Sequence, residues 1–239
     1  MLNYFVLDGK PSSDFGVYIG GQDTFGSPQR DVSKVSIQGR NGDLVRDNGR
    51  WLNITIPYNI VIMDDFQDKA DAFNAWLASK RGYVRLEDTY HPNHFRLANF
   101  SSGMTYKTAT FNDAGRGRVQ FDCKPQRFLK SGETENSFTT NGFIYNPTLF
   151  ESNPLITIVS TGTGTVTVNG TIITITGYTG TIIVDSELQD CYNSTHTQNL
   201  NSYVSLGSGK FPKLASGHSS VAISGNITSV SIAGRWYDI

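Results

Sequence analysis

The sequence lacks every charged side chain between Glu151 and Asp185, and it contains no long hydrophobic run. A membrane-spanning helix needs about 20 consecutive, mostly apolar residues. Thr, Ser and Gly interrupt the uncharged segment every few positions, and the Thr-Gly-Thr-Gly run at 161–164 would break a helix. Apolar residues alternate with Thr instead, which is the period of a half-buried strand. The segment therefore excludes a membrane span and predicts short β-strands.

Cysteines and basic clusters are also scarce. The 239 residues include two cysteines, Cys123 and Cys191, and this wide spacing predicts free thiols in a protein made in a reducing cytoplasm. The apolar N-terminal residues end at Asp8 without a basic region or a cleavage site, so we expect no signal peptide. The sequence has no basic stripe, so it does not indicate specific nucleic-acid binding. The net charge of −1 suits a component of an assembly.

Charge divides the chain into two parts. Residues 131–239 hold only 3 of the 20 Lys and Arg residues and 7 of the 21 Asp and Glu residues. Between the two parts the alternation of strands lapses into a polar stretch that begins at Lys130. We therefore predict an N-terminal domain at 1–130, a linker at 131–145 and a C-terminal domain at 146–239.

The N-terminal part predicts one helix among strands and hairpins. The helix is expected at 64–80, where apolar residues recur at helical spacing on one face: Phe66, Ala70, Phe73, Trp76 and Leu77. Asn41-Gly42 and residues 112–117 predict the turns of two hairpins. A long strand is expected from Trp51 to Ile62, with Pro57 marking a bulge or an edge.

The C-terminal part predicts only strands, separated by Gly or Asn turns. Seven or eight short strands are typical of a β-sandwich. The predicted fold class is therefore mainly β: an N-terminal β-sandwich-type domain with one α-helix and hairpins, followed by a second β-sandwich.

No motif predicts catalysis, a cofactor or a metal site. His91 and His94 follow Glu87 and Asp88, but Pro92 prevents a helical pair of metal ligands. We expect these histidines to cap backbone groups or to face solvent. The chain is therefore predicted not to be an enzyme.

Three further groups have a functional and a structural interpretation. Asp185, Glu187 and Asp190 could supply the two carboxylates of a glycosidase, but their clustering on one segment favours solvated rim residues. The tryptophans could stack on sugars, but each lies where a core position is expected: Trp51, Trp76 and Trp236. Three arginines could hold a phosphate, but the interleaved Asp43 and Asp47 favour surface ion pairs: Arg40, Arg46 and Arg50.

Three passages are together similar to one protein family. The first is Ser13–Val17 with Ile37–Leu44, and the second is Phe121–Leu129. The third consists of segments spread from Asn146 to Tyr237. In their order and spacing they resemble the distal tail (Dit) proteins of siphophages, the bacteriophages with long non-contractile tails. The third passage resembles the galectin-like, carbohydrate-binding-module-like C-terminal domain of that family.

The resemblance implies a structural hub in the tail tip or baseplate of a virion, assembled in the cytoplasm of the bacterial host. Six copies would form a ring closed by symmetry. The N-terminal domains would surround a channel for DNA and tape-measure protein, between the major tail (tube) protein and the tail-associated tip or lysin protein. The C-terminal domains would project outward and, in some relatives, hold receptor-binding proteins. No membrane partner and no cofactor is implied.

The predicted ring and tube interface lies on extended segments, because strands with exposed edges invite pairing with a neighbouring subunit. Its residues are Arg40, Asn41, Gly42, Trp51 and Arg116. The alternative function is a carbohydrate-binding module that contacts the host cell wall. Against it, residues 155–184 lack the charged side chains and the Trp with which galectins bind sugars.

Overall fold

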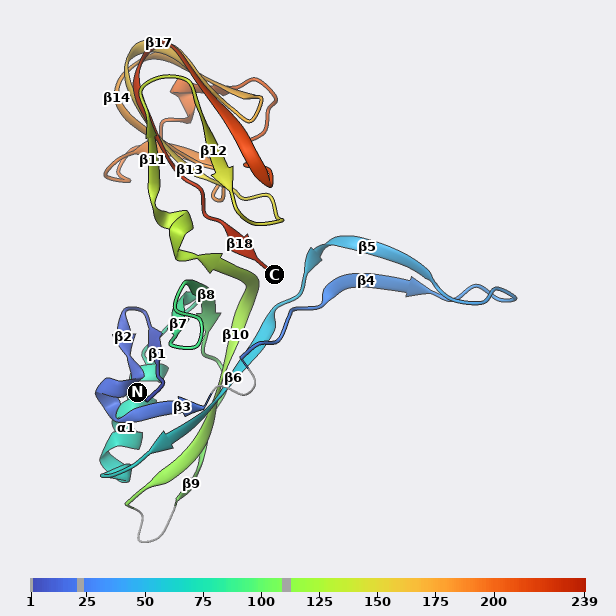
Figure 1. Cartoon of the computed structure of the whole chain (residues 1–239), viewed down its shortest axis with the longest axis vertical. Helices are drawn as coiled ribbons and strands as arrows, with labels where there is room; N and C mark the ends of the chain where they lie inside the picture. Colours follow the sequence, from blue (N-terminus) through green and yellow to red (C-terminus); the bar gives the residue numbers. More distant parts are fainter. Residues whose placement is uncertain (1, 21–23, 109–112) are drawn as a thin grey trace. The chain divides into compact units, whose positions relative to one another are not determined.

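The structure is a computed structural model that describes residues 2–20, 24–108 and 113–239. Contacts within the chain divide it into two units, Met1–Arg127 with Ile239 and Phe128–Asp238. In Figure 1 the first unit is coloured from blue to green and the second from green to red. Each unit has its own sheet and hydrophobic core. Both consist mainly of strands, which confirms the predicted mainly β class.

The sheet of the first unit curls around its core. The strands of this unit are β1 (Phe5–Leu7), β2 (Lys10–Pro11), β3 (Val17–Gly20), β4 (Arg30–Val35), β5 (Leu44–Trp51), β6 (Ile54–Ile62), β7 (Val84–Asp88), β8 (His94–Asn99), β9 (Thr105–Thr108) and β10 (Gly115–Leu129). The sheet runs in the order β2-β1-β7-β8-β10-β6-β3, with β9 beside β10. The Ile19 N–H donates to the Asn3 carbonyl (2.8 Å), which joins the β3 end of this path to the chain before β1.

The helix α1 (Phe66–Ala78) packs on this core, and its buried residues are the five predicted to share a face. The Phe73 ring lies 6.1 Å from the Phe5 ring, centroid to centroid. Asp65 stands at the N-cap position, but its side chain makes no capping hydrogen bond. The Asp65 carboxylate instead lies 3.8 Å from the Lys69 ammonium. The apolar period therefore located the helix, whereas the acidic residue before its first turn forms an exposed ion pair instead of a cap.

The long strand predicted from Trp51 is divided in two. β5 ends at Trp51 and β6 begins at Ile54. Within β6, Pro57 lies outside the stretch that pairs with β3, which extends from Asn59 to Ile62. Pro57 thus occupies a partly open edge, as expected for a residue without an N–H.

The second predicted hairpin is confirmed as a pairing of β9 with β10, with Thr108 opposite Gly115. The predicted turn at 112–117 is wrong in its second half, because residues 115–117 belong to β10 and pair with β9; residue 112 lies outside the described residues.

The second unit is built on three long strands rather than on the many short ones predicted. Its strands are β11 (Glu135–Phe138), β12 (Gly142–Asn146), β13 (Leu155–Val168), β14 (Thr171–Asp185), β15 (Asp190–Asn193), β16 (Val204–Leu206), β17 (Gly217–Ala233) and β18 (Tyr237–Asp238). The sheet runs in the order β11-β17-β13-β14-β15, with β12 beside β17 and β16 beside β14. Short 3-10 helices precede β3, β11 and β16: η1 (Ser12–Phe15), η3 (Lys130–Glu133) and η4 (Asn201–Tyr203).

Glycines bend these long strands instead of ending them. The register between β13 and β14 shifts between Gly162 and Gly164. Beyond this point β17 pairs with β12 instead of β11, and β14 pairs with β16 instead of β15. Both halves bury their apolar residues in one core, in which Ile158 and Val166 are fully buried. The sandwich is therefore one sheet folded over at glycine bulges.

The predicted linker at 131–145 is wrong, because this stretch belongs to the second sheet. β11 pairs Phe138 with Val230, and β12 pairs Ile144 with Ser219, both on β17. Gly132 packs so closely on the backbone of Trp236 that a Cβ there would lie 2.4 Å from its nitrogen. The polar side chains of β11 face solvent. A mostly exposed edge strand has little apolar alternation, which made it look like a linker.

Candidate assembly interface

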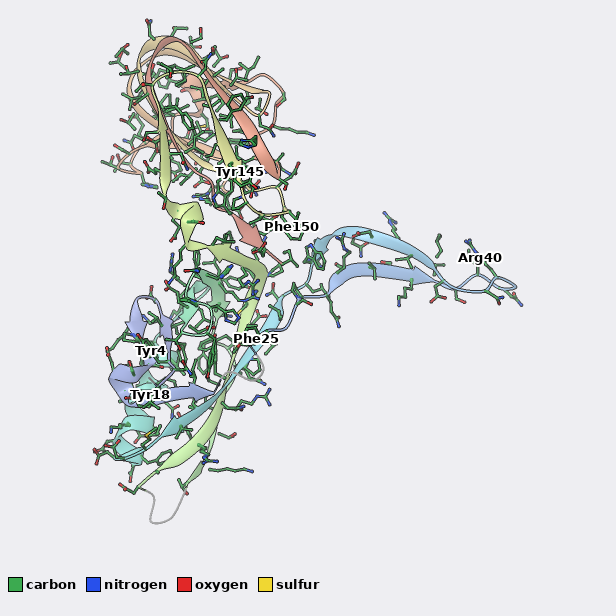
Figure 2. The ribbon with its side chains drawn as sticks, in the orientation of Figure 1. Tyr4, Tyr18, Phe25, Arg40, Tyr145 and Phe150 are labelled. Atoms are coloured by element: carbon green, nitrogen blue, oxygen red, sulfur yellow. The ribbon has the colours of Figure 1, made fainter. Side chains whose placement is uncertain are left out.

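Three of the predicted interface residues lie at the tip of a hairpin formed by β4 and β5. These two strands make a sheet of their own, with Val35 opposite Leu44 and Arg30 opposite Trp51. Figure 2 shows Arg40 at the tip of this hairpin. The chain turns there because the Ile37 carbonyl accepts the Arg40 N–H (3.1 Å). The hairpin predicted at Asn41-Gly42 is confirmed.

Glycine is required in this loop. Gly39 and Gly42 have φ angles of 79° and 82°, in the left-handed region that strains other residues.

Both faces of the hairpin are exposed over most of its length. Four apolar side chains lie open there, at 40–57% of their full accessible area: Val35, Ile37, Leu44 and Val45. An isolated two-stranded ribbon is marginally stable in water. Exposed apolar side chains on such a ribbon make it a candidate contact surface for another protein.

Cross-strand ion pairs hold the register of the hairpin. Arg30 Nη1 lies 2.6 Å from Asp47 Oδ2, and Arg50 Nε lies 2.6 Å from Asp31 Oδ2. Hydrogen bonds from Asn48 and from Arg50 lower the pKa of the Asp31 carboxyl. Of the residues predicted to form surface ion pairs, Arg50 and Asp47 do so, but with Asp31 and Arg30 of β4 rather than with the interleaved residues of β5. Exposed ion pairs contribute little free energy of folding. Their main effect here is therefore on the alignment of β4 with β5 and not on the stability of the hairpin.

The other two predicted residues lie in different surroundings. Trp51 is half-buried at the base of the hairpin, where the Arg30 guanidinium lies 4.5 Å from its ring. Arg116 is exposed on β10, opposite Val61 of β6 and Lys107 of β9. The hairpin therefore unites four of the five predicted residues, and Arg116 lies on the main sheet of the first unit.

The histidines were expected to cap backbone groups or to face solvent, and His91 does not face solvent. His91 is mostly buried, and its Nδ1 lies 3.0 Å from Asp88 Oδ1. Within residues 2–20, 24–108 and 113–239, no three His, Cys, Asp or Glu side chains are grouped to hold a metal ion. The same part of the chain contains no helix that is both long and apolar enough to span a membrane.

Asp185 was expected at a solvated rim and is instead buried, with 2% of its surface exposed. Arg235 donates to its two oxygens at 2.7 and 3.0 Å, and the Tyr192 hydroxyl donates at 3.1 Å. Burial acts to raise the pKa of Asp185, but the hydrogen bonds from Arg235 and from the Leu188 N–H outweigh it and lower the pKa. This carboxylate is therefore a structural ion-pair partner. Its partner lies 50 residues further along the chain, out of reach of local pattern analysis.

An exposed aromatic surface on β12 and β17 was missed from the sequence. Phe143 and Tyr145 are 72% and 57% exposed, and the His218 ring lies 5.0 Å from the Tyr145 ring. The signal was the alternation of these two aromatics around the buried Ile144. We call Phe143, Tyr145 and His218 the aromatic surface.

No protein-family model matches the sequence, and no curated protein matches it. Among solved structures, the Dit protein of phage SPP1, described as a paradigm of the hub adsorption apparatus in phages that infect Gram-positive bacteria, is similar over 100% of both chains, with a TM-score of 0.76 and 14% identity. A chain of the phage P2 baseplate, in its activated conformation with calcium, is similar over 97% of this chain and 98% of that chain, with a TM-score of 0.54 and 11% identity.

The fold is therefore that of phage tail hub and baseplate proteins. More particularly, it is the Dit fold over the full length of the chain, which confirms the resemblance seen in the sequence. At these identities the likeness concerns the fold. The galectin-like character of the second unit stays a prediction.

Proposed function

We propose that this chain is the structural hub of a phage tail tip. In this proposal six copies close into a ring that joins the major tail (tube) protein to the tail-associated tip protein. The second unit of each copy would offer a surface to receptor-binding proteins. The full-length likeness to the Dit hub carries this proposal. A hub acts by contact and needs no catalytic site.

The β4–β5 hairpin supports the proposal because the outer edges of its two strands are open to pairing with another chain. Within the part of the chain that the structure describes, each of its strands pairs only with the other. Their outer edges therefore present backbone donors and acceptors to a further strand. A contact between this hairpin and a different surface of the next copy is heterologous, and such contacts close into a ring when the rotation fits.

Native mass spectrometry of a variant with a shortened hairpin tests this role. Replacing residues 36–43 by Asn-Gly joins Val35 and Leu44 through a two-residue hairpin turn and removes the tip. We expect this variant to stay folded and to lose the ring. A shortened chain that still forms complete rings would exclude the hairpin tip as a ring contact.

The Arg40 assignment has its own test. Arg40→Ala should reduce ring formation, whereas Arg81→Ala removes an arginine that is also exposed and should leave it unchanged. If Arg40→Ala gives intact rings and a normal yield of infectious particles, Arg40 is not an interface residue, and the hub proposal still stands.

Binding of host cell-wall saccharide is a second candidate function, and the aromatic surface is the observation that favours it. Aromatic rings present large, rigid apolar faces with little conformational entropy to lose. A glycan array with the full chain should then show saturable binding that Tyr145→Ala removes and that Leu188→Ala, at another exposed site, keeps. Absence of saturable binding to cell-wall glycans would dismiss this candidate.

A further inference from the structure

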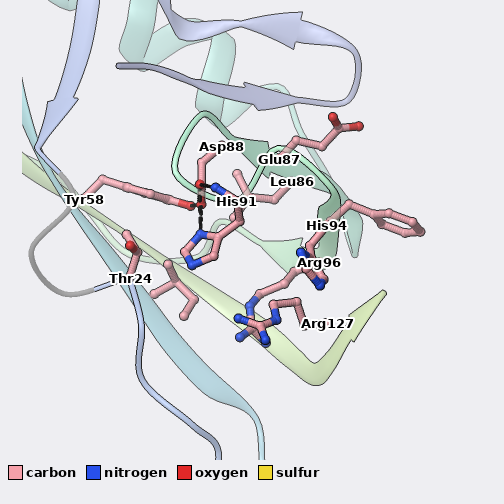
Figure 3. Close-up of a pocket in the computed structure, with 11 residues that line it drawn as sticks. Thr24, Tyr58, Leu86, Glu87, Asp88, His91, His94, Arg96 and Arg127 are labelled. Carbon is pink, nitrogen blue, oxygen red and sulfur yellow. Dashed lines mark hydrogen bonds and ion pairs between the residues drawn. The ribbon is translucent and has the colours of Figure 1, made fainter. Parts of the chain in front are cut away.

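A small cavity in the first unit gathers charged and polar side chains from several strands. Tyr58 comes from β6, Asp88 and His91 from the end of β7 and its turn, Arg96 from β8 and Arg127 from β10. Figure 3 shows these side chains converging on one space. The cavity volume is about 20 Å³. A single water needs roughly 10–15 Å³, so the cavity admits one small chemical group.

The negative charge of this cluster is fully engaged by neighbours. Asp88 Oδ2 accepts the Tyr58 hydroxyl at 2.7 Å. Asp88 Oδ1 accepts the N–H groups of Tyr90 (2.9 Å) and His91 (2.8 Å), and lies 3.0 Å from His91 Nδ1. With four contacts, this carboxylate has little capacity left for the arginines. The second ring nitrogen of His91 is therefore the one left to face another group.

The two arginines, in contrast, form no ion pair with an acidic side chain among the described residues. Arg96 is 8% exposed and donates from Nη1 to the Pro125 carbonyl at 3.2 Å. Across the described residues, Arg127 Nε and His91 Nε2 are buried atoms without a hydrogen-bond partner. A buried donor without an acceptor destabilises the protein by roughly 1–3 kcal/mol. Such groups in a native structure call for an unseen partner.

The electrostatics favour a negative partner. Burial lowers the pKa of the Arg96 guanidinium, and repulsion from the neighbouring Arg127 acts in the same direction, whereas interactions with Cys123, Tyr58 and Asp88 act to raise it. Two guanidinium groups of like charge repel each other unless an anion lies between them. Glu87, the other carboxylate at the cavity, pairs with Arg85.

We propose that this cavity binds one carboxylate group, held by Arg96 and Arg127. A guanidinium presents parallel N–H donors that match the two oxygens of a carboxylate. The cavity volume accepts such a planar group and leaves no room for a nucleotide or a sugar ring. The group comes either from a free small acid or from a Glu or Asp side chain of a neighbouring protein. This inference does not depend on the hub role.

NMR of the full chain, with arginine labelled by ¹⁵N, tests the site. Sodium acetate is titrated at constant ionic strength against sodium chloride, and the Nε–H signals of Arg96 and Arg127 are followed, the Arg96 signal serving for the Arg127→Gln variant. We expect a saturable shift with acetate that chloride does not produce. Arg127→Gln should weaken acetate binding by about tenfold or more, and Arg81→Gln should leave it unchanged. The unaltered remainder of the spectrum verifies that each variant is folded.

Two further probes identify the ligand. A capped Gly-Glu-Gly peptide should saturate the site if the carboxylate belongs to a protein side chain, and binding of acetate without the peptide assigns the site to free acids. Gly-Gln-Gly is the neutral control. The proposal is overturned if Arg127→Gln binds acetate as well as the natural chain, if chloride gives the same shift, or if inorganic phosphate binds more tightly than acetate.

Discussion

The chain contains two long antiparallel ribbons that are stabilised in opposite ways. In the β13–β14 ribbon of the second unit, alternate side chains are buried in a shared core. In the β4–β5 hairpin of the first unit, nearly every side chain is exposed, and charged residues pair across the strands. The first ribbon, whose one charged residue is Asp185 at the end of β14, thus builds its own unit, and the charged hairpin has no core to join.

The difference separates stability from assembly. A ribbon buried on one face is held by the hydrophobic effect, at roughly 25 cal/mol for each Å² of apolar surface removed from water. A ribbon exposed on both faces gains little of this energy, so its lasting order depends on partners. Substitutions in the second unit should therefore act on unfolding, and substitutions in the hairpin should act on association.

Paired isoleucine truncations should show the largest contrast. Ile158→Ala in β13 removes a fully buried side chain, and we expect a loss of about 2–5 kcal/mol in the free energy of unfolding. Ile37→Ala, in the hairpin loop, removes a side chain that is 40% exposed and should change unfolding by about 0.5 kcal/mol or less. Urea denaturation of both variants measures this. Equal losses of unfolding free energy in the two variants would contradict the proposed difference between the ribbons.

The next largest difference in the free energy of unfolding should come from removing one arginine that pairs with each ribbon. Arg235→Gln leaves the buried Asp185 without its counter-charge. Breaking a buried pair typically destabilises by about 3–5 kcal/mol. We expect about 2–3 kcal/mol, since the Arg235 side chain is 29% exposed. Arg50→Gln, at a 71% exposed pair of the hairpin, should leave the unfolding curve unchanged.

The pH dependence sharpens this prediction. The pKa of Asp185 is lowered in the folded chain. The stability it contributes is therefore fully present above the unfolded-state pKa near 4 and is lost as pH falls through the lower folded value. The difference between the natural chain and Arg235→Gln should be constant near neutral pH and shrink below about pH 4. A difference that stays the same at low pH would show that Asp185 does not carry this energy.

Glycine substitutions in the second unit and in the hairpin should differ less in their effect on stability. Gly225 has a φ of 72°, and a Cβ there would lie 2.8 Å from the Gly164 Cα at the bend of the sandwich. Gly225→Ala should therefore destabilise the fold by about 1–3 kcal/mol. Gly42 has a similar φ but open space around it, so Gly42→Ala strains the hairpin loop alone. Thermal unfolding should respond to the first variant and not to the second.

Local sequence signals predicted the elements whose causes are local. The period of Phe66, Ala70 and Phe73 located α1, and Asn41-Gly42 located the hairpin turn. The glycines of β13 were misinterpreted as ends of strands, because a glycine tolerates a bulge and a turn equally well. Which of the two forms depends on the strands beside it, and these come from distant parts of the sequence.

The two charged clusters were beyond the reach of sequence patterns for the same reason. Asp185 meets Arg235 only because β14 and the chain after β17 are brought together by the folded sheet. Arg96 and Arg127 meet only because β8 pairs with β10. Neither spacing has a local period that would single these residues out.

The molar mass of the full chain tests the hub proposal most directly. Native mass spectrometry, joined to negative-stain images, should be applied to the chain alone and to its mixture with the tail-tube and tip proteins. The proposal predicts particles of six times the 26.3 kDa chain mass with the outline of a closed ring. A monodisperse monomer that forms no ring, even with these partners, would contradict it.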